Sequence, residues 1–481
     1  MPHYSRMKIS LVTPPFDLIR SAYASSSKIK RGNLPPLGIG YLASSLKANG
    51  FNQIKLLDGT SMGINEEEFI ELVLKDSPDL IGISCMTASS HEAFRLARKI
   101  RKLSNVLIVF GGPHVTDFGK EVLLEEKAID LAVVGEGEET IVELCDRLNA
   151  GKELSNIKGL IFRDKDEIID NGPRVSKGPL DDIPMPAWEL YDNTLYCPLP
   201  NSYKRLPSAT VITARGCAYR KCAFCYTGGM LGQPFRRHSI KRVIEEIKIL
   251  VNSYGMREIQ FLDSIFILNR QWVKEFCEAI IRENIDITWN CGAKADLVDP
   301  EILEIVAKAG CYSIFYGLES GNQDLLDIIE KGITIQQIKD AVKWAHRAGI
   351  DTRGSFILGL PGETPQKANK TIDLAIELDL TYAQFNLAFP FKGTKLYDFA
   401  LDMGSVFEYR GLTKATYVPH GYRDRDELEA VMRKAYFKFY FRPAYFMKHL
   451  KRLKNFNELK RYFDGLRFII GIIFNKAMGR K

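Results

Sequence analysis

Three cysteines lie close together near the middle of the chain, at Cys217, Cys222 and Cys225. Thiolates are soft ligands that bind zinc or iron–sulfur clusters, and a short loop can bring three of them around one metal centre. A structural zinc site normally has four protein ligands, and no further Cys or His completes a pair just downstream. Three thiolates on a four-iron cluster would leave one iron open to a substrate or cofactor. The spacing therefore favours an iron–sulfur centre, with a zinc knuckle or buried thiols as the alternative.

The same stretch resembles the radical S-adenosylmethionine (SAM) superfamily, whose motif is Cys-x3-Cys-x2-Cys with an aromatic residue before the last cysteine. Phe224 supplies that aromatic residue, whereas the first spacing here is Cys-x4-Cys, one residue longer. A surface loop can absorb such an insertion. The resemblance implies a [4Fe–4S] cluster held by Cys217, Cys222 and Cys225, with SAM bound at the open iron. Reductive cleavage of SAM would give a 5′-deoxyadenosyl radical that abstracts hydrogen from an unactivated carbon.

The length and composition of the chain indicate its number of domains and its cellular compartment. A chain of 481 residues is long enough for two or three domains. No apolar run reaches the roughly 18 residues needed to cross a bilayer, and the N-terminus lacks the apolar region of a signal peptide. Nine cysteines with a single tight cluster favour metal binding over a disulfide framework. We therefore expect a cytoplasmic protein.

Residues 1–150 alternate between strand and helix patterns, which predicts a parallel, doubly wound sheet. The predicted strands are residues 8–14, 53–58, 80–85, 107–111 and 131–134, and the predicted helices between them are 66–75, 91–103 and 138–148. Loops at the carboxyl edge of such a sheet bind ligands. The candidate cofactor-binding residues at that edge are Ser84, Thr87, Gly111, Gly112, Gly135, Glu136 and Gly137.

This half of the chain resembles the cobalamin-binding domain that precedes many radical SAM domains. The matching motifs are Leu37-Gly-Ile-Gly-Tyr, Gly111-Gly-Pro-His and Val134-Gly-Glu-Gly-Glu-Glu-Thr. The Asp-x-His-x-x-Gly motif is missing, since Thr60 stands in the His position after Asp58. The resemblance thus implies cobalamin bound without a protein imidazole below cobalt. The alternatives are Rossmann-type turn glycines around a nucleotide or around no cofactor, and for His114 a capping or hydrogen-bonding role is favoured over that of a ligand.

Residues 151–206 read as a charged hairpin followed by a Pro-rich linker, and strand–helix alternation resumes over residues 207–403. The predicted strands are 211–214, 258–263, 287–292, 313–319, 352–358 and 382–388, and the predicted helices are 240–254, 270–283, 300–309, 335–348, 365–377 and 396–403. Six such repeats predict an open, six-stranded partial (β/α) barrel with its chemistry at the carboxyl ends of the strands. Its open end is wide enough for a large substrate.

Further candidate residues follow the ends of these strands. Asp263 ends the second strand, Glu319 and Ser320 end the fourth, and the fifth runs into Ile357 and Gly359. Carboxylates near a cluster can accept hydrogen bonds from an ammonium group or from ribose hydroxyls. By resemblance, Asp263 and Glu319 contact SAM, and the backbone from Ile357 to Gly359 lies near its adenine. Each of these residues alone would also suit a cap or a turn.

The C-terminal region, residues 404–481, is predicted to be helical, aromatic and basic. From Arg433 to Lys481 it holds 14 Lys and Arg against two acidic residues, a charge of +12, so the remainder of the chain carries 7 − 12 = −5. Aromatic residues at Phe437, Phe439, Tyr440, Phe441, Tyr445 and Phe446 are interleaved with these cations. Such a segment can lie on an anionic membrane, bind nucleic acid or cap the barrel. No RNA-binding motif supports nucleic acid as the partner.

The sequence thus predicts an α/β protein: a Rossmann-like cobalamin-binding domain, a six-stranded partial barrel and a helical C-terminal segment. Its predicted function is C-methylation of a large apolar substrate, a lipid or natural product, with a flavodoxin-type or ferredoxin-type electron donor. One alternative is a radical SAM enzyme that closes or rearranges a ring without methyl transfer. Another is a non-catalytic iron–sulfur or cobalamin carrier.

Overall fold

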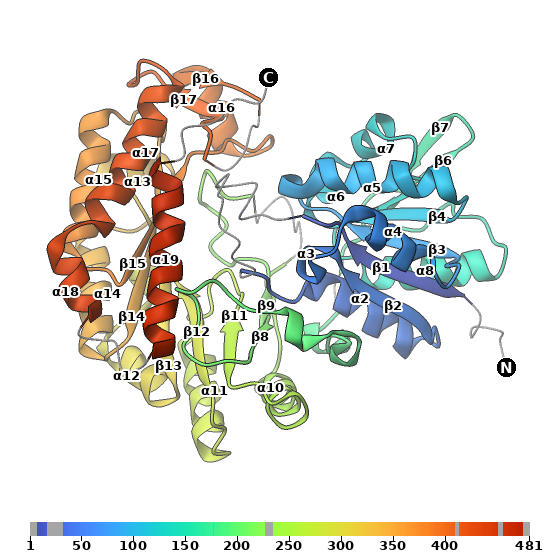
Figure 1. The fold of residues 1–481 in the computed structure, drawn as a ribbon, viewed down its shortest axis with the longest axis horizontal. Coiled ribbons are helices and arrows are strands. Elements are labelled where there is room, and N and C mark those ends of the chain that lie inside the picture. Colours follow the sequence, from blue (N-terminus) through green and yellow to red (C-terminus); the bar gives the residue numbers. More distant parts are fainter. Residues whose placement is uncertain are drawn as a thin grey trace. The chain divides into compact units, whose positions relative to one another are not determined.

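The computed structural model describes residues 7–16, 32–176, 178–226, 234–408, 413–450 and 456–474 (Figure 1). Contacts divide the chain into two compact units. The first consists of residues 1–18, 33–196 and 227–237, and the second of residues 19–32, 197–226 and 238–481. The domain boundaries drawn from the sequence stay a prediction.

The first unit is built on a seven-stranded sheet in the order β2-β1-β3-β4-β5-β6-β7. Its strands are β1 (Lys8–Thr13), β2 (Gln53–Asp58), β3 (Leu80–Ser84), β4 (Leu107–Gly111), β5 (Leu131–Val133), β6 (Leu160–Asp164) and β7 (Glu167–Asp170). The first five are parallel and the last two antiparallel. The hairpin that the sequence placed in a connector is therefore part of this sheet. It pairs with β5, which would otherwise present an unpaired edge.

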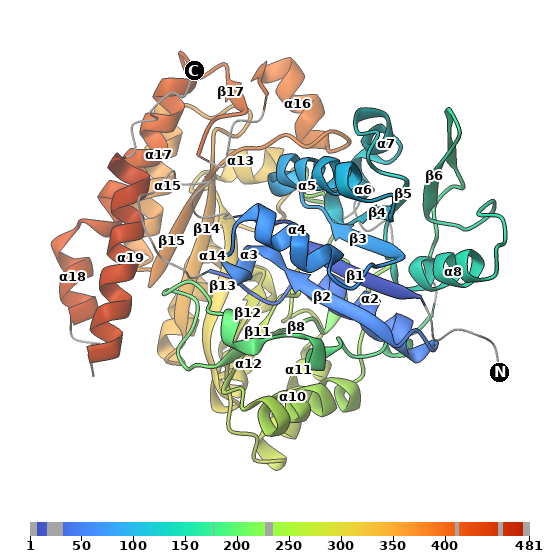
Figure 2. The same ribbon diagram turned by 45° about the vertical axis from the view of Figure 1, so that its right-hand side comes forward.

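Helices pack on both faces of this sheet (Figure 2). They are α2 (Leu37–Ala48), α3 (Gly59–Met62), α4 (Glu66–Leu74), α5 (Ser90–Leu103), α6 (Pro113–Phe118), α7 (Glu121–Glu125) and α8 (Glu138–Asn149). One core joins Phe69 of α4 and Leu96 of α5 to the sheet, and a second joins Ile39 of α2 and Leu144 of α8 to it. A parallel sheet buried on both faces is the doubly wound arrangement that the sequence predicts.

The second unit contains a six-stranded parallel sheet in the order β15-β14-β13-β12-β11-β8. Its strands are β8 (Ser208–Val211), β11 (Glu258–Phe261), β12 (Thr288–Ala293), β13 (Cys311–Glu319), β14 (Asp351–Leu358) and β15 (Tyr382–Leu387). Its helices are α10 (Ile240–Tyr254), α11 (Arg270–Arg282), α12 (Pro300–Lys308), α13 (Gln323–Ile328), α14 (Ile335–Arg347), α15 (Pro365–Glu377) and α16 (Lys395–Met403). Among the described residues no strand joins β15 to β8. The sheet is therefore an open partial barrel, as predicted.

Local sequence signals explain most of these boundaries. Ser239, Asn269, Asp299, Thr334 and Thr364 each precede a helix and accept a hydrogen bond from a backbone N–H group in its first turn. The short side-chain oxygen of each residue satisfies a donor that the helix leaves unpaired.

The first barrel strand differs from its prediction. It ends at Val211, whereas residues 211–214 were expected to form it. The N–H groups of Thr213 and Ala214 donate to the Asp263 carboxylate, at 2.7 and 2.8 Å. These donors are therefore used by a side chain instead of continuing the ladder. The short strands β9 (Ala214–Arg215), β10 (Arg236–Arg237), β16 (Gly404–Val406) and β17 (Tyr417–Pro419) complete the strand inventory of the described chain.

The C-terminal helices cover the free edge of β15. These are α17 (Arg425–Tyr440), α18 (Pro443–Leu450) and α19 (Phe456–Phe474). The Tyr436 hydroxyl accepts from the N–H group and donates to the carbonyl of Phe385, both at 3.2 Å. The Tyr440 hydroxyl does the same for Ala383, at 3.1 and 2.7 Å. Tyrosine hydroxyl groups thus take the place of a seventh strand.

Charge supports the same packing. Lys448 contacts the Asp379 carboxylate at 2.7 Å, Arg442 lies 3.6 Å from it, and Lys438 lies 3.8 Å from Asp373. Cations of the basic tail are thus partly paired with carboxylates of the more acidic barrel. Residues 451–455 and 475–481 of this tail lie outside the described residues.

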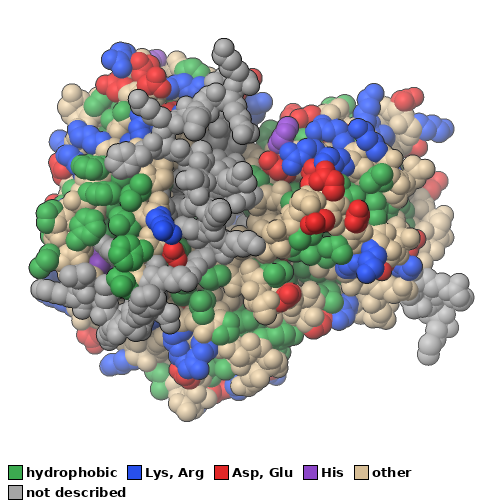
Figure 3. All heavy atoms as spheres, viewed as in Figure 1, with side chains coloured by type: hydrophobic (Ala, Val, Ile, Leu, Met, Phe, Trp, Pro, Cys, Tyr) green, Lys and Arg blue, Asp and Glu red, His purple; other side chains and the backbone are tan. Residues whose placement is uncertain are grey.

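The aromatic residues of the tail divide into two groups. Phe439, Tyr440 and Tyr445 are buried, whereas Phe437 is 49% exposed. Phe437 stacks on Phe441, which in turn contacts Phe446. Hydrophobic side chains gather on the side of the surface where α18 and α19 lie (Figure 3). No helix in the described ranges has the length and hydrophobicity to span a bilayer.

We expect the substitution Tyr440→Phe to destabilise the second unit. It removes one hydroxyl and leaves the buried N–H and C=O groups of Ala383 unpaired, at a cost of about 1–3 kcal/mol. Thermal unfolding should show a fall of about 2–4 °C per kcal/mol. Tyr397→Phe is the matched control, because the hydroxyl of Tyr397 makes no hydrogen bond to another described residue. Equal stability of the two variants would contradict the edge-covering role.

Candidate functional site

The cysteine loop follows β8 and β9 at the carboxyl edge of the barrel sheet. Cys217 and Cys222 are half-buried, and Cys225 is exposed. The loop is fastened at Ala223, whose N–H group donates to Ile329 beyond α13 and whose carbonyl accepts from Leu396 in α16, both at 2.9 Å. Two barrel elements therefore fix the backbone between the second and third cysteines.

The additional residue between the first two cysteines has a definite structural place. Arg220 adopts a left-handed conformation with φ of 52°, and its Nε donates to the carbonyl of Cys217 at 3.2 Å. The hydroxyl of Tyr219 donates to the carbonyl of Glu330 at 2.9 Å, and the ammonium group of Lys294 lies 4.4 Å from its ring centroid. The longer spacing is thus absorbed by one tight turn and by docking of Tyr219 on the barrel.

A buried ion pair lies beside this loop. Lys331 Nζ contacts the Glu319 carboxylate at 2.7 Å and lies 5.6 Å from the centroid of Phe224. Burial raises the pKa of the Cys222 thiol to about 11, while the positive charge of Lys331 acts in the opposite direction. The pair therefore brings a cation next to a cysteine that must lose its proton to bind metal. No local pattern indicates Lys331, because a lysine just beyond a helix is ordinarily exposed.

Glu319 itself is held in an uncommon conformation. Its φ is 60°, and the pairing register of β13 shifts between Gly317 and Glu319. A side chain on Gly317 would lie 2.5 Å from the Glu319 carboxylate and 2.9 Å from Lys331 Nζ. Left-handed backbone at a non-glycine residue is costly and is concentrated at functional sites. The missing side chain at position 317 makes room for the ion pair.

Two other predicted SAM contacts, Asp263 and Ser320, are hydrogen-bonded to residues of the second unit. Asp263 accepts from Thr213 Oγ1 at 2.5 Å as well as from two backbone N–H groups, so it fixes the segment that leads to the cysteine loop. Ser320 is fully buried and accepts from the N–H group of Asn322 at 3.2 Å. Its side chain is thus occupied by the turn that follows β13. The roles of Asp263 and Ser320 toward SAM stay predictions.

The end of β14 is shaped by a buried carboxyl group. Ile357 is half-buried, and Gly359 has φ of 78° and donates its N–H group to Glu363 at 2.5 Å. Glu363 also accepts from the hydroxyl of Tyr422 at 2.7 Å, and burial raises its pKa to about 7. A side chain on Gly359 would contact Leu428 of α17. The predicted adenine-side backbone is therefore held by the C-terminal region.

The donor set fits an iron–sulfur cluster. Three thiols within nine residues, one of them exposed, can each bind a different iron atom of a cubane. Within the described residues, no group of three or more His, Cys, Asp or Glu side chains is placed to hold a single metal ion. Cys217, Cys222 and Cys225 would be the ligands.

In the first unit the predicted edge residues come together at the ends of β3 and β4. Ser84 pairs with Gly111, and Gly112 has φ of 99°. A side chain at Gly112 would lie 2.9 Å from the carbonyl oxygen of Cys85 and 3.3 Å from Ser84 Oγ. The backbone therefore turns here in a way that glycine alone permits easily.

The third edge loop is joined to the second by Thr116, which the sequence analysis did not identify. Thr116 Oγ1 donates to the carbonyl of Gly112 at 3.1 Å and accepts from the N–H group of Gly135 at 3.0 Å. A side chain at Gly135 would meet no atom within 4 Å, whereas one at Gly137 would lie 3.2 Å from Leu42. Open space over Gly135 fits the approach of a flat ligand such as cobalamin. The carboxylate of Glu136 is paired with Arg236.

His114 does not have the surroundings of a metal ligand. It is buried between the rings of Phe94 and Phe118, with centroid distances of 5.8 and 4.5 Å. Its Nδ1 lies 3.4 Å from Thr87 Oγ1, and burial lowers the pKa of the imidazole to about 4. The hydrogen-bonding role favoured by the sequence is therefore the one that the structure shows.

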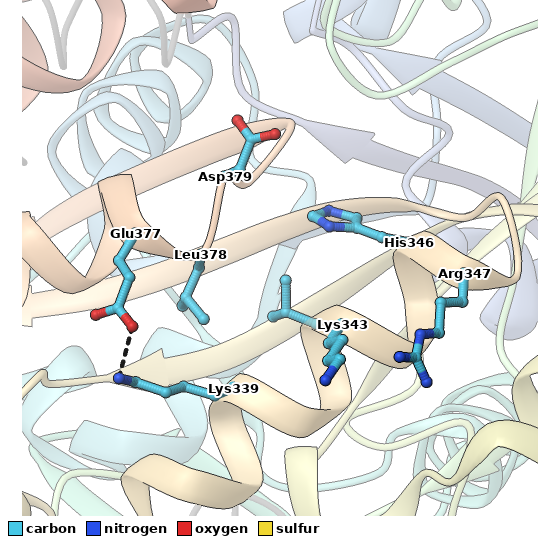
Figure 4. A pocket seen from close by; sticks show the side chains of 8 residues that line it. Lys339, Lys343, His346, Arg347, Glu377, Leu378 and Asp379 are labelled. Atoms are coloured by element: carbon cyan, nitrogen blue, oxygen red, sulfur yellow. Dashed lines mark ion pairs between the residues drawn. The ribbon is translucent and has the colours of Figure 1, made fainter.

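A separate hollow of about 390 Å³ lies on the outer, helical side of the barrel (Figure 4). Its lining comes from α14 and the end of α15 and includes the ion pair of Lys339 with Glu377 at 2.6 Å. None of its residues belongs to the cysteine loop or to the other predicted sites. It carries no argument about the chemistry.

Comparison with known sequences gives two kinds of match. The chain matches the Radical SAM superfamily over residues 211–375 and the B12 binding domain over residues 30–145. It is 35% identical over 472 residues to an uncharacterized methyltransferase of Pyrococcus horikoshii, covering 96% of this chain and 98% of that protein. It is 29% identical over 438 residues to an anaerobic magnesium-protoporphyrin IX monomethyl ester cyclase of Cereibacter sphaeroides, with coverages of 88% and 70%. It is 26% identical over 451 residues to the cytidylyl-2-hydroxyethylphosphonate methyltransferase of Streptomyces wedmorensis, with coverages of 82% and 83%.

Two solved structures share the fold. The radical SAM methyltransferase TsrM of Kitasatospora setae, solved with cobalamin and a [4Fe–4S] cluster, has a TM-score of 0.67 at 20% identity, covering 88% of this chain and 85% of its own. The cobalamin-dependent radical enzyme OxsB has a TM-score of 0.69 at 17% identity, with coverages of 98% and 72%. At 20% identity or below, these likenesses show a shared fold.

Replacing any one of Cys217, Cys222 or Cys225 with Ala should abolish the visible absorption of a reconstituted cluster and most of its bound iron. The reason is that two thiolates cannot hold the cubane at this edge. Iron and sulfide analysis after anaerobic reconstitution measures the effect. Cys145→Ala is the control, since Cys145 is buried in the core of the first unit. Equal iron loss in that control would contradict the three-ligand assignment.

Bound cob(II)alamin should lack nitrogen superhyperfine coupling in its electron paramagnetic resonance spectrum. Among the edge-loop residues, the first suspect for an axial ligand is His114, which is enclosed by Phe94 and Phe118 and cannot turn outward without unpacking them. The spectrum of His114→Ala should match that of the unchanged protein. Coupling that disappears in the variant would identify His114 as an axial ligand and overturn the assignment.

Proposed function

Because the chain belongs to the cobalamin-binding radical SAM family, we propose that it is a C-methyltransferase that acts on an unactivated carbon. Its cofactors are a [4Fe–4S] cluster, SAM and cobalamin. The observation that carries the proposal is the full-length likeness, at 35% identity, to a protein described as a methyltransferase. Both cofactor-binding domains lie within the aligned length.

Separate sets of residues would bind the cluster and cobalamin. Cys217, Cys222 and Cys225 would hold the cluster, and the glycine loops at Gly112 and Gly135 would hold cobalamin. The bound cofactors supply a 5′-deoxyadenosyl radical and a transferable methyl group. The positive charge of Lys331 favours the thiolate form of Cys222 beside it.

The sequence suggested a large apolar molecule, a lipid or natural product, because of the wide barrel and the aromatic tail. With Phe439, Tyr440 and Tyr445 buried, the argument for a lipid or a membrane surface rests on Phe437, Phe441 and Phe446. Cosedimentation of the full-length protein with anionic liposomes across a salt series tests it, and indifference to liposomes at low salt removes it.

Two expectations concern the cell. Nine cysteines without a disulfide in the described chain suit a reducing compartment, so we place the enzyme in the cytoplasm. Cluster reduction calls for a small electron donor of the flavodoxin or ferredoxin type.

The second candidate is a radical SAM enzyme that closes or rearranges a ring. It is favoured by the 29% identity to a protein named as a cyclase, over 88% of this chain. A carrier without catalysis does not explain a barrel that positions Glu319 and Lys331 beside the cysteine loop.

One assay separates the two enzyme candidates. The protein is reconstituted anaerobically with iron, sulfide, cobalamin and reductant. It is then incubated with SAM and a small-molecule extract of cells of the organism that encodes it. Methyl transfer yields both S-adenosylhomocysteine and 5′-deoxyadenosine, whereas ring closure yields 5′-deoxyadenosine alone. The absence of both products would refute the proposed function.

A further inference from the structure

The face of the barrel sheet that points away from the helices carries a row of polar side chains on its last strands. Along β14, Thr352, Phe356 and Leu358 are fully buried, while Arg353 and Ser355 alternate with them and are half-buried. On β15, Asn386 donates to Ser355 Oγ at 3.0 Å and accepts from Gln384 at 3.0 Å. These residues therefore share one face of the sheet.

Arg353 is exceptional among the interior cations of this unit. Lys331 is paired with Glu319 and Arg242 with Glu246, at 2.7 and 3.0 Å. Arg353 makes neither an ion pair nor a hydrogen bond to any other described residue, and its guanidinium lies 5.5 Å from the ring centroid of Phe315. A cation inside a protein is normally paired, since burial without a partner is costly.

Glu258, a carboxylate whose charge acts on Arg353, does not serve as that partner. Glu258 is fully buried and accepts from the N–H groups of Lys204 and Arg205, from Thr288 Oγ1 and from the hydroxyl of Tyr312, at distances between 2.7 and 3.0 Å. Its acceptor sites are thus already used by neutral donors. Burial lowers the pKa of Arg353, as expected for a cation without a bound anion.

The position of Arg353 connects it to the candidate active site. Ser355 pairs with Gly317, whose missing side chain leaves room for Glu319 and Lys331, and Arg353 pairs with Phe315 two residues earlier. Two residues along a strand correspond to about 7 Å. On the neighbouring strand β12, Gly292 pairs with Phe315 and adds no side chain to this face. A molecule lying below the cysteine loop along this face would reach the guanidinium.

We propose that this face binds an anionic group of the substrate, a carboxylate or a phosphate, with Arg353 as the cationic partner and Ser355 and Asn386 as neutral hydrogen-bonding partners. A guanidinium presents a planar set of donors that matches both anions. The inference rests on the proposed function for the identity of this face as a substrate site. It adds the chemical class of one substrate group.

The test maps modification by phenylglyoxal, a reagent for arginine, in the reconstituted holoenzyme by peptide mass spectrometry. Inorganic phosphate in one arm and propionate in the other represent the two anions, and sodium chloride at equal ionic strength is the reference. With an anion at ten times its dissociation constant, modification of Arg353 should slow by about tenfold in at least one arm. The arm that protects identifies the anion.

Arg347 is the internal control, because it is exposed on the outer side of the barrel and should react equally in all arms. As a second measurement, Arg353→Gln should abolish the rise in unfolding temperature that the protecting anion gives, and Arg347→Gln should retain it. An Arg353 that does not react, or that reacts equally in every arm, overturns the proposal. SAM cleavage by the unchanged enzyme is assayed separately, so failure of anion binding and failure of the proposed function are distinguished.

Discussion

A parallel sheet that stops at six strands leaves two things unsatisfied, the backbone of its edge strand and the face that a closed barrel would fill with side chains. The edge is satisfied at β15 by the hydroxyl groups of Tyr436 and Tyr440, which make the hydrogen bonds that a further strand would make. The candidate site lies at the carboxyl edge of the same sheet. The C-terminal helices and the candidate site thus follow from the same open architecture.

The secondary structure was largely predictable because the signals are local. The bounds of β2, α10 and α15 agree with the sequence prediction to the residue, since alternation and N-cap residues define them. The predicted strand bounds and pairings are wrong where a residue or strand distant in the sequence determines the hydrogen bonding. Asp263 takes the N–H groups that would have extended β8, and the 160–170 hairpin joins a sheet whose open edge no local pattern announces.

The candidate site divides in the same way. The cysteines and the Glu319 carboxylate could be found because their spacing or strand-end position is visible in the sequence. The sequence does not reveal the importance of Lys331, Tyr219 and Arg353. Their importance depends on which residues of other elements lie near them. Lys331 is distinguished by its burial against Glu319, Tyr219 by its hydrogen bond to Glu330, and Arg353 by lacking a charged partner among the described residues. Burial and pairing of this kind do not appear in a linear pattern.

The tail shows why a basic aromatic segment is ambiguous in sequence. Alternating aromatic and cationic residues suit a membrane surface, but they equally suit a helix whose tyrosines bond to a sheet edge while its cations meet carboxylates at Asp373 and Asp379. In the structure, most of these aromatic and cationic contacts are made within the protein. With the buried aromatics thus accounted for, the character of the substrate is better inferred from the barrel face itself. That face is polar around Ser355 and Asn386 and cationic at Arg353, so a purely hydrocarbon substrate would leave the guanidinium desolvated and unpaired, whereas a substrate with an anionic group would neutralise it.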